Sequence, residues 1–339
     1  MTTKTLPLLA ALLLGSAAQA TILTVHSDPL YSAQFSSAGA AITAASPFDT
    51  LLVHGSATTY GNITVNKPLT LIGPGHDPAV TQRATFSNIN ITSDSVVLEG
   101  LTWSTLSMNH NGIRLLRNRI TGYAILNSAS AEVLIAGNVF EGAYLNVSTA
   151  ATNVEVRNNY FSETSTGGNG VFRDGSATTL VHWNVFVRSS TSTSTSNVIF
   201  IPSSAFTVLA DNVFITATVA SFNVGDCPNY SFQNNLSYSD AGTLPSMGPN
   251  NLDNTPPTWD LGGAYPTFNY THDHNMLSGA PLTGASDGGQ VGVMGGPNPF
   301  VSNGLPSLIP RVTATELETP YVPVGGSIDV NFQAEQGQP

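Results

Sequence analysis

Short segments of alternating apolar residues recur through the middle of the chain, and each is interrupted by an Asn or a Gly. Alternation with a period of two indicates strands that bury one face. The seven segments lie at 96–101, 113–120, 133–140, 154–161, 180–186, 208–214 and 230–236. Their aligned positions are Gly100, Asn118, Asn138, Asn159, Asn184, Asn212 and Asn235.

The repeat length predicts the architecture. Successive aligned positions are about 22 residues apart, and this period with a strand–Asn–strand pattern is typical of a β-solenoid. A leucine-rich repeat has a similar period but requires a fixed Leu ladder, which the chain lacks. A sandwich or barrel would not place Asn at one recurring point.

The recurring Asn or Gly suggests a corner between two strands of one coil. We expect this residue itself to adopt the left-handed conformation, which Asn and Gly tolerate best. If the coils stack in register, the asparagines also stack and form an amide ladder along the axis.

Together these segments resemble the right-handed parallel β-helices of the pectate-lyase-like superfamily. Residues 40–53 resemble the capping helix and first coil of that family, and residues 60–73 resemble the next coil. Residues 276–296 resemble a closing segment of exported bacterial β-helix proteins. The resemblance implies an all-β fold, a right-handed parallel β-helix, over most of residues 30–300. Because this fold carries many activities, the resemblance indicates fold more strongly than chemistry.

The two ends of the chain complete the predicted organisation. Residues 1–20 read as a signal peptide, with Lys4, a short apolar run and a small-x-small cleavage site. The parallel β-helix with its capping segments follows over 21–300, and a short helix at 36–45 is expected to cap it. Residues 301–339 form a C-terminal β tail, a small appendage with strand-like runs at 311–316 and 327–334.

Export implies a secreted or cell-surface protein. The predicted signal peptide is too short to span a bilayer, and no later segment reads as a transmembrane helix. Cys227 is the single cysteine, so no intrachain disulfide can form. Stability must therefore come from a large core or from repetition.

Composition narrows the possible partners. Charged residues make up 9% of the chain, against about 25% in an average globular protein. Ser, Thr and Asn take their place, while hydrophobic residues at 41% are enough to form a core. The formal net charge is −11 and no basic run occurs, which excludes a typical nucleic-acid binder.

The search for catalytic groups follows from the family resemblance. Lyases of this superfamily use a Lys or Arg base and often Ca²⁺ held by Asp or Glu. We place the first strand of each coil about 11–15 residues before its Asn. The outward positions are then Ala124, Leu126, Tyr144, Asn146, Val171, Arg173, Ile199, Ile201, Ser221 and Asn223.

Arg173 is the charged residue among these positions, and Asp174 follows it. They are the candidate catalytic pair, with Tyr144, Asn146 and Asn223 as candidate substrate-binding residues. A salt bridge at a strand end is the structural alternative. No stack of carboxylates appears, so no metal site is predicted, and Ca²⁺ would be expected only of a lyase.

Two further groups of residues carry alternatives. Arg114, Arg117, Arg119 and Arg157 with Glu99, Glu132 and Glu155 fall near the second strand of adjacent coils, as an ion-pair ladder or an acidic-glycan site. The His272-Asp273-His274 segment places two imidazoles on one side of a strand, but two His do not complete a Zn²⁺ site.

Two functions remain open from the sequence. The first is a non-catalytic surface or extracellular protein that binds a polysaccharide or cell-surface glycan; the scarcity of charged groups favours it. The second is a polysaccharide lyase or glycoside hydrolase acting on an acidic glycan, which the family resemblance and the Arg173-Asp174 pair favour.

Overall fold

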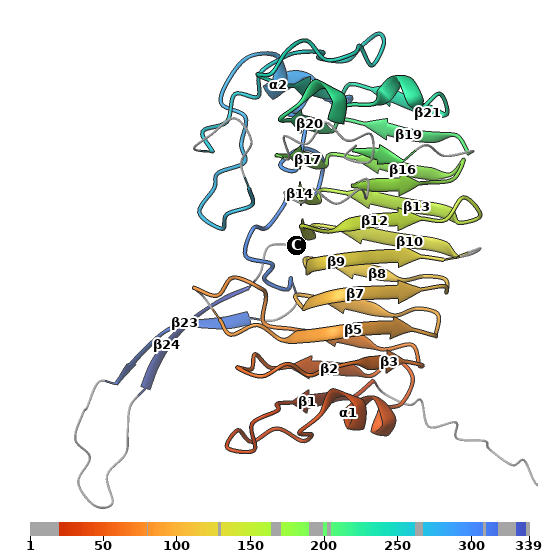
Figure 1. The fold of residues 1–339 in the computed structure, drawn as a ribbon. Coiled ribbons are helices and arrows are strands. Elements are labelled where there is room, and N and C mark those ends of the chain that lie inside the picture. Colours follow the sequence, from red (N-terminus) through yellow and green to blue (C-terminus); the bar gives the residue numbers. More distant parts are fainter. Residues whose placement is uncertain are drawn as a thin grey trace, which may run out of the picture.

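Strands stacked in parallel form a β-solenoid of about eight turns (Figure 1). The computed structural model describes residues 20–79, 81–127, 130–163, 171–189, 199–201, 205–261, 267–307, 310–317 and 330–336. The predicted signal peptide, except Ala20, and most of a Ser/Thr-rich segment at 188–197 lie outside the described residues. The prediction of an all-β parallel solenoid is confirmed.

One wall of the solenoid is a parallel sheet that the chain revisits once per coil. Within the described residues it contains ten strands in coil order. They are β1 (Ile22–Val25), β2 (Thr50–Val53), β4 (Thr70–Ile72), β6 (Val97–Glu99), β8 (Arg114–Leu116), β10 (Ala131–Ala136), β13 (Thr152–Arg157), β16 (Thr179–His182), β19 (Thr207–Ala210) and β21 (Tyr230–Gln233).

The second sheet starts as one wall and divides into two branches. Its first four strands are β3 (Ile63–Val65), β5 (Thr85–Ile91), β7 (Thr102–Met108) and β9 (Arg119–Leu126). β9 pairs with both β11 and β12, so later coils have a third side. One branch contains β11 (Val139–Glu141), β14 (Tyr160–Glu163), β17 (Val185–Arg188), β20 (Val213–Thr216) and β22 (Leu236–Tyr238), and the other contains β12 (Tyr144–Val147), β15 (Phe172–Asp174) and β18 (Phe200–Ile201).

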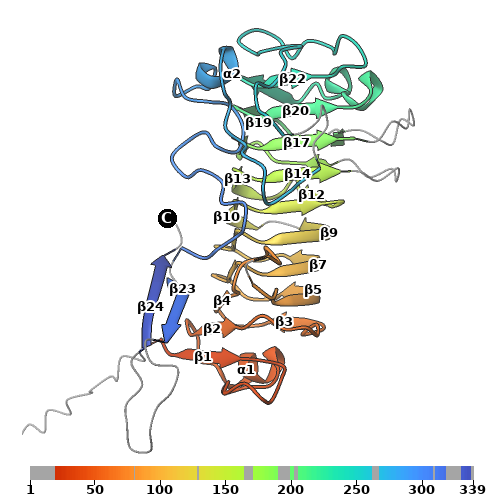
Figure 2. The same cartoon turned by 90° about the vertical axis from the view of Figure 1, so that its left-hand side faces the viewer.

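The ends carry the short helices and a hairpin. Helix α1 (Ala38–Ala44) covers the first coil, where the sequence predicts a cap. Short helices η1 (Val219–Ser221), η2 (Val224–Asp226) and α2 (Ala280–Thr283) lie toward the other end. β23 (Pro310–Leu317) and β24 (Val330–Gln336) pair as an antiparallel hairpin beside the first coils (Figure 2).

Helix α1 is fixed at both ends. The Ser37 hydroxyl accepts a hydrogen bond from the amide of Ala40, which caps the N-terminus. At the other end the Lys67 ammonium donates to the carbonyls of Ile42, Thr43 and Ala45 at 2.7–3.0 Å. A cation is favourable there because the last carbonyls of a helix have no partners within it.

The core is a stack of equivalent side chains. Leu71, Leu98, Leu115 and Ile135 occupy one register position on successive coils and are fully buried. On the second sheet, Phe140, Phe161, Phe186 and Phe214 stack with ring centroids 4.4–5.2 Å apart. Equal residues at equal positions keep the coils in register.

The Asn ladder consists of the six asparagines Asn118, Asn138, Asn159, Asn184, Asn212 and Asn235, all fully buried. In each of them, the side-chain Nδ2 donates to the Oδ1 of the ladder asparagine in the next coil. The main-chain N–H of the same residue donates to that Oδ1 as well, and the distances are 2.9–3.1 Å. Nδ2 also donates to a carbonyl of the preceding coil, such as Leu98 for Asn118. Asn251 supplies a seventh rung that the repeat pattern did not show.

The prediction that these asparagines adopt the left-handed conformation is wrong. The residue immediately before each of the seven rungs has the positive φ: Arg117 (55°), Gly137 (68°), Asn158 (51°), Trp183 (50°), Asp211 (59°), Asn234 (54°) and Asn250 (64°). Gly100 (64°) aligns with Arg117 one coil earlier, where Leu101 stands in place of a ladder asparagine. Asn is used inside the corner because its amide satisfies the main-chain groups that the turn leaves unpaired.

A C-terminal strap, residues 267–307, runs back along this corner. The side chains that precede successive rungs hold it: Asn234 donates to the Gly284 carbonyl, Asp211 accepts from the Ser286 amide and hydroxyl, and Arg117 donates to the Leu305 carbonyl. From residue 284 to residue 305 the coil order decreases as the residue number rises, so this part of the strap descends the solenoid (Figure 1).

The strap creates a second apolar core. Val139, Tyr160, Val185 and Val213 point away from the first core and are buried beneath Met276, Val291, Val293 and Phe300 of the strap. The strands of this branch are therefore buried on both faces and have no polar side. This explains their adjacent apolar residues, such as Val185-Phe186, of which one enters each core.

Two buried histidines lie under the strap. His274 packs against Tyr160 and Phe300, and burial, with His272 nearby, lowers its pKa to about 4. His76 bonds to the Tyr270 hydroxyl at 3.1 Å, and burial lowers its pKa to about 3, helped by Arg119 and Arg83. Both are neutral in the folded protein near pH 7.

We expect Asn159→Leu to lower the free energy of unfolding by roughly 3 kcal/mol, because a Leu side chain can make none of the buried hydrogen bonds that the Asn159 amide makes to Asn138, Ile135 and Asn184. Urea unfolding measures this. The control Asn90→Ala changes an exposed asparagine on a strand and should cost less than about 0.5 kcal/mol. Equal losses in the two variants would contradict the ladder as a source of stability.

Acid should destabilise the strap. In the unfolded chain both histidines protonate near pH 6.5, whereas in the folded protein the pKa of His274 is about 4 and that of His76 about 3. The free energy of unfolding is therefore highest above pH 6.5 and falls as the pH drops below it. From pH 7 to pH 5 the loss is up to about 2 kcal/mol per histidine. His274→Phe should reduce the pH slope of urea unfolding by about one proton; an unchanged slope would contradict the assignment.

Candidate functional site

The outer face of the second sheet, before and beyond its division, carries two aligned columns of mostly uncharged polar side chains. We call it the polar wall. Its first column contains Asn62, Asn88, Thr105, Tyr123 and Tyr144, and its second contains Thr64, Asn90, Ser107, Ile125, Asn146 and Arg173. Strand alternation puts both columns on one face, while residues between them, such as Ile89 and Leu106, enter the core.

Side chains of the wall are joined along the solenoid axis. Asn88 Nδ2 donates to Asn62 Oδ1 at 2.9 Å, and the Thr105 hydroxyl donates to Asn88 Oδ1. Beside the second column, Asn127 Nδ2 donates to the Ser107 hydroxyl at 3.0 Å. These contacts orient the amides while leaving them at the surface, so the wall is a preorganised array of hydrogen-bonding groups.

An aromatic and cationic stack continues the wall. The rings of Tyr123 and Tyr144 stack with centroids 5.5 Å apart, and the Arg173 guanidinium lies 3.9 Å from the Tyr144 centroid. The Tyr144 ring therefore lies between a ring and a guanidinium, a favourable cation–π arrangement. The edge of Tyr144, rather than its faces, is what a ligand would meet.

Asp174 lies beside this stack, at the rim of an open hollow of about 450 Å³. Asn127, Asn146, Ser148 and Thr149 also line the hollow. Partial burial raises the pKa of the Asp174 carboxyl, while the Arg173 charge opposes that rise. The structure thus brings Tyr144, Asn146, Arg173 and Asp174 together from β12 and β15, as strand pairing requires.

Asn223 does not join them. Its Nδ2 donates to the Phe200 carbonyl at 3.1 Å and its Oδ1 accepts from the Phe200 amide at 3.4 Å. The side chain completes the backbone pairing of β18 at the end of its branch, which is a structural task.

The expected outward positions Ala124 and Leu126 are wrong, because both are fully buried. In that coil Tyr123 and Ile125 face outward, a shift of one residue that exchanges the faces of β9. Val171, Ile199 and Ser221 are likewise buried, and the side chain of Ile201 lies outside the described residues. Tyr123 was missed for this reason, although its pairing with Tyr144 is local in the sheet.

Several charged residues on or next to the first sheet form ion pairs, whereas Arg114 and Glu132 form none with the described residues. Arg117 lies 3.6 Å from Glu99, and Arg157 lies 3.1 Å from Glu155. Arg119 is bound to Glu141 of the second sheet at 2.6 Å. Both Glu99 and Arg117 also contact the strap, through Ser307 and Leu305.

Within the ranges that the structure describes, no three His, Cys, Asp or Glu residues gather in a metal-binding arrangement. The imidazoles of His272 and His274 have centroids 6.0 Å apart and belong to the aromatic packing of the strap. Cys227 is buried, and burial raises its thiol pKa to about 12.

Comparison with known proteins gives no relative for this geometry. The chain matches no protein-family model, no curated protein and no solved structure. A search of the described helices finds none with the length and apolar character to cross a membrane.

The carboxyl of Asp174 should titrate above its usual range. We expect Arg173→Gln to raise its pKa further, because that change removes the charge that opposes the effect of burial. Carbon-detected NMR titration of the aspartate side chains measures both values. An Asp174 pKa at or below that of the solvent-exposed aspartates would contradict this electrostatic account.

Proposed function

We propose that this chain is an exported protein of the cell surface or extracellular space that binds a neutral polysaccharide along the polar wall without catalysis. One observation carries the proposal: an extended face of oriented amides and hydroxyls repeats at the coil spacing. Strands of a sheet lie about 4.8 Å apart. A linear polymer with many hydroxyls can therefore meet the same kind of partner on coil after coil.

Charge supports a neutral ligand. The formal net charge of −11 would repel an acidic polymer, and the polar wall carries few charges to offset it. Its cation, Arg173, is stacked on Tyr144. Hydrogen bonds to hydroxyl groups then supply the recognition.

The proposed location rests on residues 1–20, which have the composition of a signal peptide. The helical cap, the solenoid and the closing strap support placing the chain with bacterial exported proteins of the pectate-lyase-like superfamily. N-terminal sequencing of the protein recovered from an expressing bacterial culture tests export, with a mature start at residue 21 expected.

Hydrolysis or lyase chemistry on an acidic glycan is the second candidate. Asp174 favours it, because a carboxyl with a raised pKa beside an open hollow has the properties of a general acid. Such a reaction would release reducing ends, or unsaturated uronates absorbing in the ultraviolet, from a panel of pectate, alginate and glycosaminoglycan. Product formation that is lost on Asp174→Asn would establish it in place of the binding function.

We expect Asn88→Ala combined with Thr105→Ala to weaken polysaccharide binding about tenfold, the equivalent of one or two neutral hydrogen bonds. Affinity electrophoresis in gels that contain xylan, glucan, mannan or galactan measures this. Gln233→Ala, which removes an exposed amide from the other sheet, is the matched control and should bind like the unaltered protein. Failure of the unaltered protein to bind any of these polymers would contradict the proposal.

A further inference from the structure

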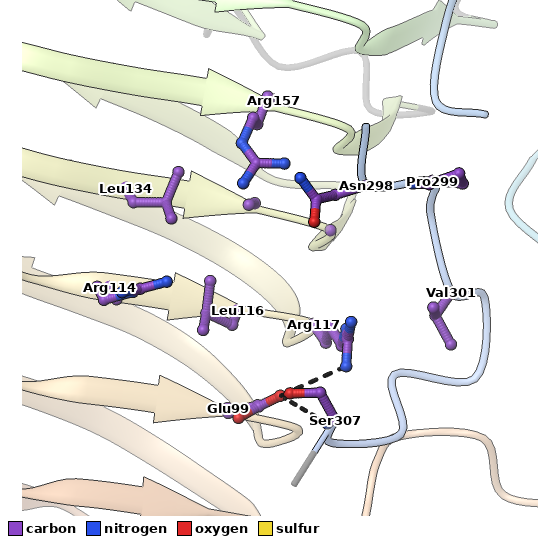
Figure 3. A pocket seen from close by; sticks show the side chains of 12 residues that line it. Glu99, Arg114, Leu116, Arg117, Leu134, Arg157, Asn298, Pro299, Val301 and Ser307 are labelled. Atoms are coloured by element: carbon purple, nitrogen blue, oxygen red, sulfur yellow. Dashed lines mark hydrogen bonds and ion pairs between the residues drawn. The ribbon is translucent and has the colours of Figure 1, made fainter. Parts of the chain in front are cut away.

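A small pocket lies where the outer face of the first sheet meets the C-terminal strap (Figure 3). Its volume is about 130 Å³. Leu134 and Arg157 line it from the solenoid, and Asn298 and Val301 line it from the strap. The pocket can hold several water molecules or one compact polar group, and it is too small for a chain of sugars.

Positive charge is concentrated here. Arg114, Arg117 and Arg157 line the pocket and account for three of the ten basic residues of the chain. Of the described residues in its lining, Glu99 is the one carboxylate. Glu99 is already occupied, because it lies 3.6 Å from Arg117 and accepts from the Ser307 amide at 3.0 Å.

Arg157 presents its hydrogen-bond donors to the pocket. Its Nε is bound to Glu155 at 3.1 Å, which fixes the plane of the guanidinium. The terminal nitrogens and the amide nitrogen of Asn298 point toward one another in Figure 3. Both groups are hydrogen-bond donors, so an acceptor that enters the pocket can bind to the two of them at once.

Arg114 adds to the potential at the pocket. It projects from β8, is exposed, and makes no ion pair with any described residue. With the charge of Glu99 balanced by Arg117, the charge of Arg114 is left to attract an anion.

We propose that this pocket binds a small tetrahedral oxyanion, a sulfate or phosphate group, with Arg157 and Asn298 as its direct ligands and Arg114 as a supporting charge. A guanidinium is well suited to such a group because it offers parallel N–H donors in a fixed plane. Arg157 belongs to the solenoid and Asn298 to the strap, so the bound anion ties the strap to the sheet. This inference is independent of the proposed polysaccharide function, which concerns the other sheet.

Titration of the protein with sodium sulfate and with sodium phosphate tests the site. Binding is measured by calorimetry, at an ionic strength held constant with sodium chloride. We expect saturable binding of one ion per chain, weakened at least tenfold by Arg157→Gln. Arg114→Gln should weaken it less. Arg173→Gln removes the same charge from the polar wall and should leave sulfate binding unchanged.

Hydrogen exchange reports the coupling to the strap. At a sulfate concentration 100 times the dissociation constant, amides of residues 293–307 that exchange only when the strap opens should slow by up to about 100-fold. Amides at the far end of the solenoid, in β1 and β2, that exchange by local opening should not change.

A free ion and a substituent on a polymer can present the same chemistry. Dextran sulfate with dextran as its control separates the two: the sulfated polymer alone should bind if the anion arrives on a polymer, and Arg157→Gln should abolish that binding. Three results would overturn the proposal: no saturable binding of either ion or of dextran sulfate, equal loss in Arg173→Gln, or an unprotected strap at saturation.

Discussion

The buried amide ladder is the interaction on which the rest of this structure depends. Each coil turns sharply just before its ladder asparagine, and the turn leaves main-chain groups facing the interior. An unpaired buried N–H or C=O costs on the order of 1–3 kcal/mol. Without the asparagine side chains, a corner repeated on seven coils would strongly destabilise the folded state. The asparagine side chain pairs these groups and links each coil to the next. Coil register, and with it every aligned column on the outer walls, follows from that link.

The outer side of the corner, formed by the residues that immediately precede the ladder asparagines, has a different role. Its residues have positive φ and point away from the core, so their side chains are free to hold another segment. Asn234, Asp211 and Arg117 do so along the strap. At Gly296 the strap approaches the Trp183 ring so closely that a Cβ would lie 2.7 Å from it, so the strap needs glycine there. The strap buries the outer side of one branch and does not cover the outer faces of the opposite branch and of the undivided wall.

Much of the fold could be predicted from the sequence, because repetition averages out local ambiguity. The period, the six asparagines, helix α1 and the two C-terminal strands were all visible as patterns. The exact corner was not, since Asn and Gly are both plausible left-handed residues and the structure uses the position before the ladder. Asn251 was missed because no alternating strand flanks it.

The candidate site was only partly predictable. Tyr144, Asn146, Arg173 and Asp174 come together because β12 and β15 are neighbours, and strand spacing was enough to find them. Tyr123 was not found because the outward positions of its coil were expected at Ala124 and Leu126, one residue too late, although Tyr123 lies as far before Asn138 as Tyr144 lies before Asn159. A slip of one residue along a strand reverses inside and outside. The sequence grouped Arg114, Arg117 and Arg157 on adjacent coils, as an ion-pair ladder or an acidic-glycan site. The pocket itself could not be predicted, since Asn298 comes to its lining only through the path of the strap. With charged residues at 9% of the chain, the gathering of three arginines there is the clearest departure from a neutral surface.

The most direct test of this account is hydrogen exchange of the asparagine side-chain amides, measured by NMR. If the ladder holds the coils together, the Nδ2 protons of Asn138, Asn159 and Asn184 should exchange only on global unfolding, with the slowness of the core backbone amides. Exchange as fast as that of the exposed Asn88 and Asn90 amides would contradict the ladder as the central interaction.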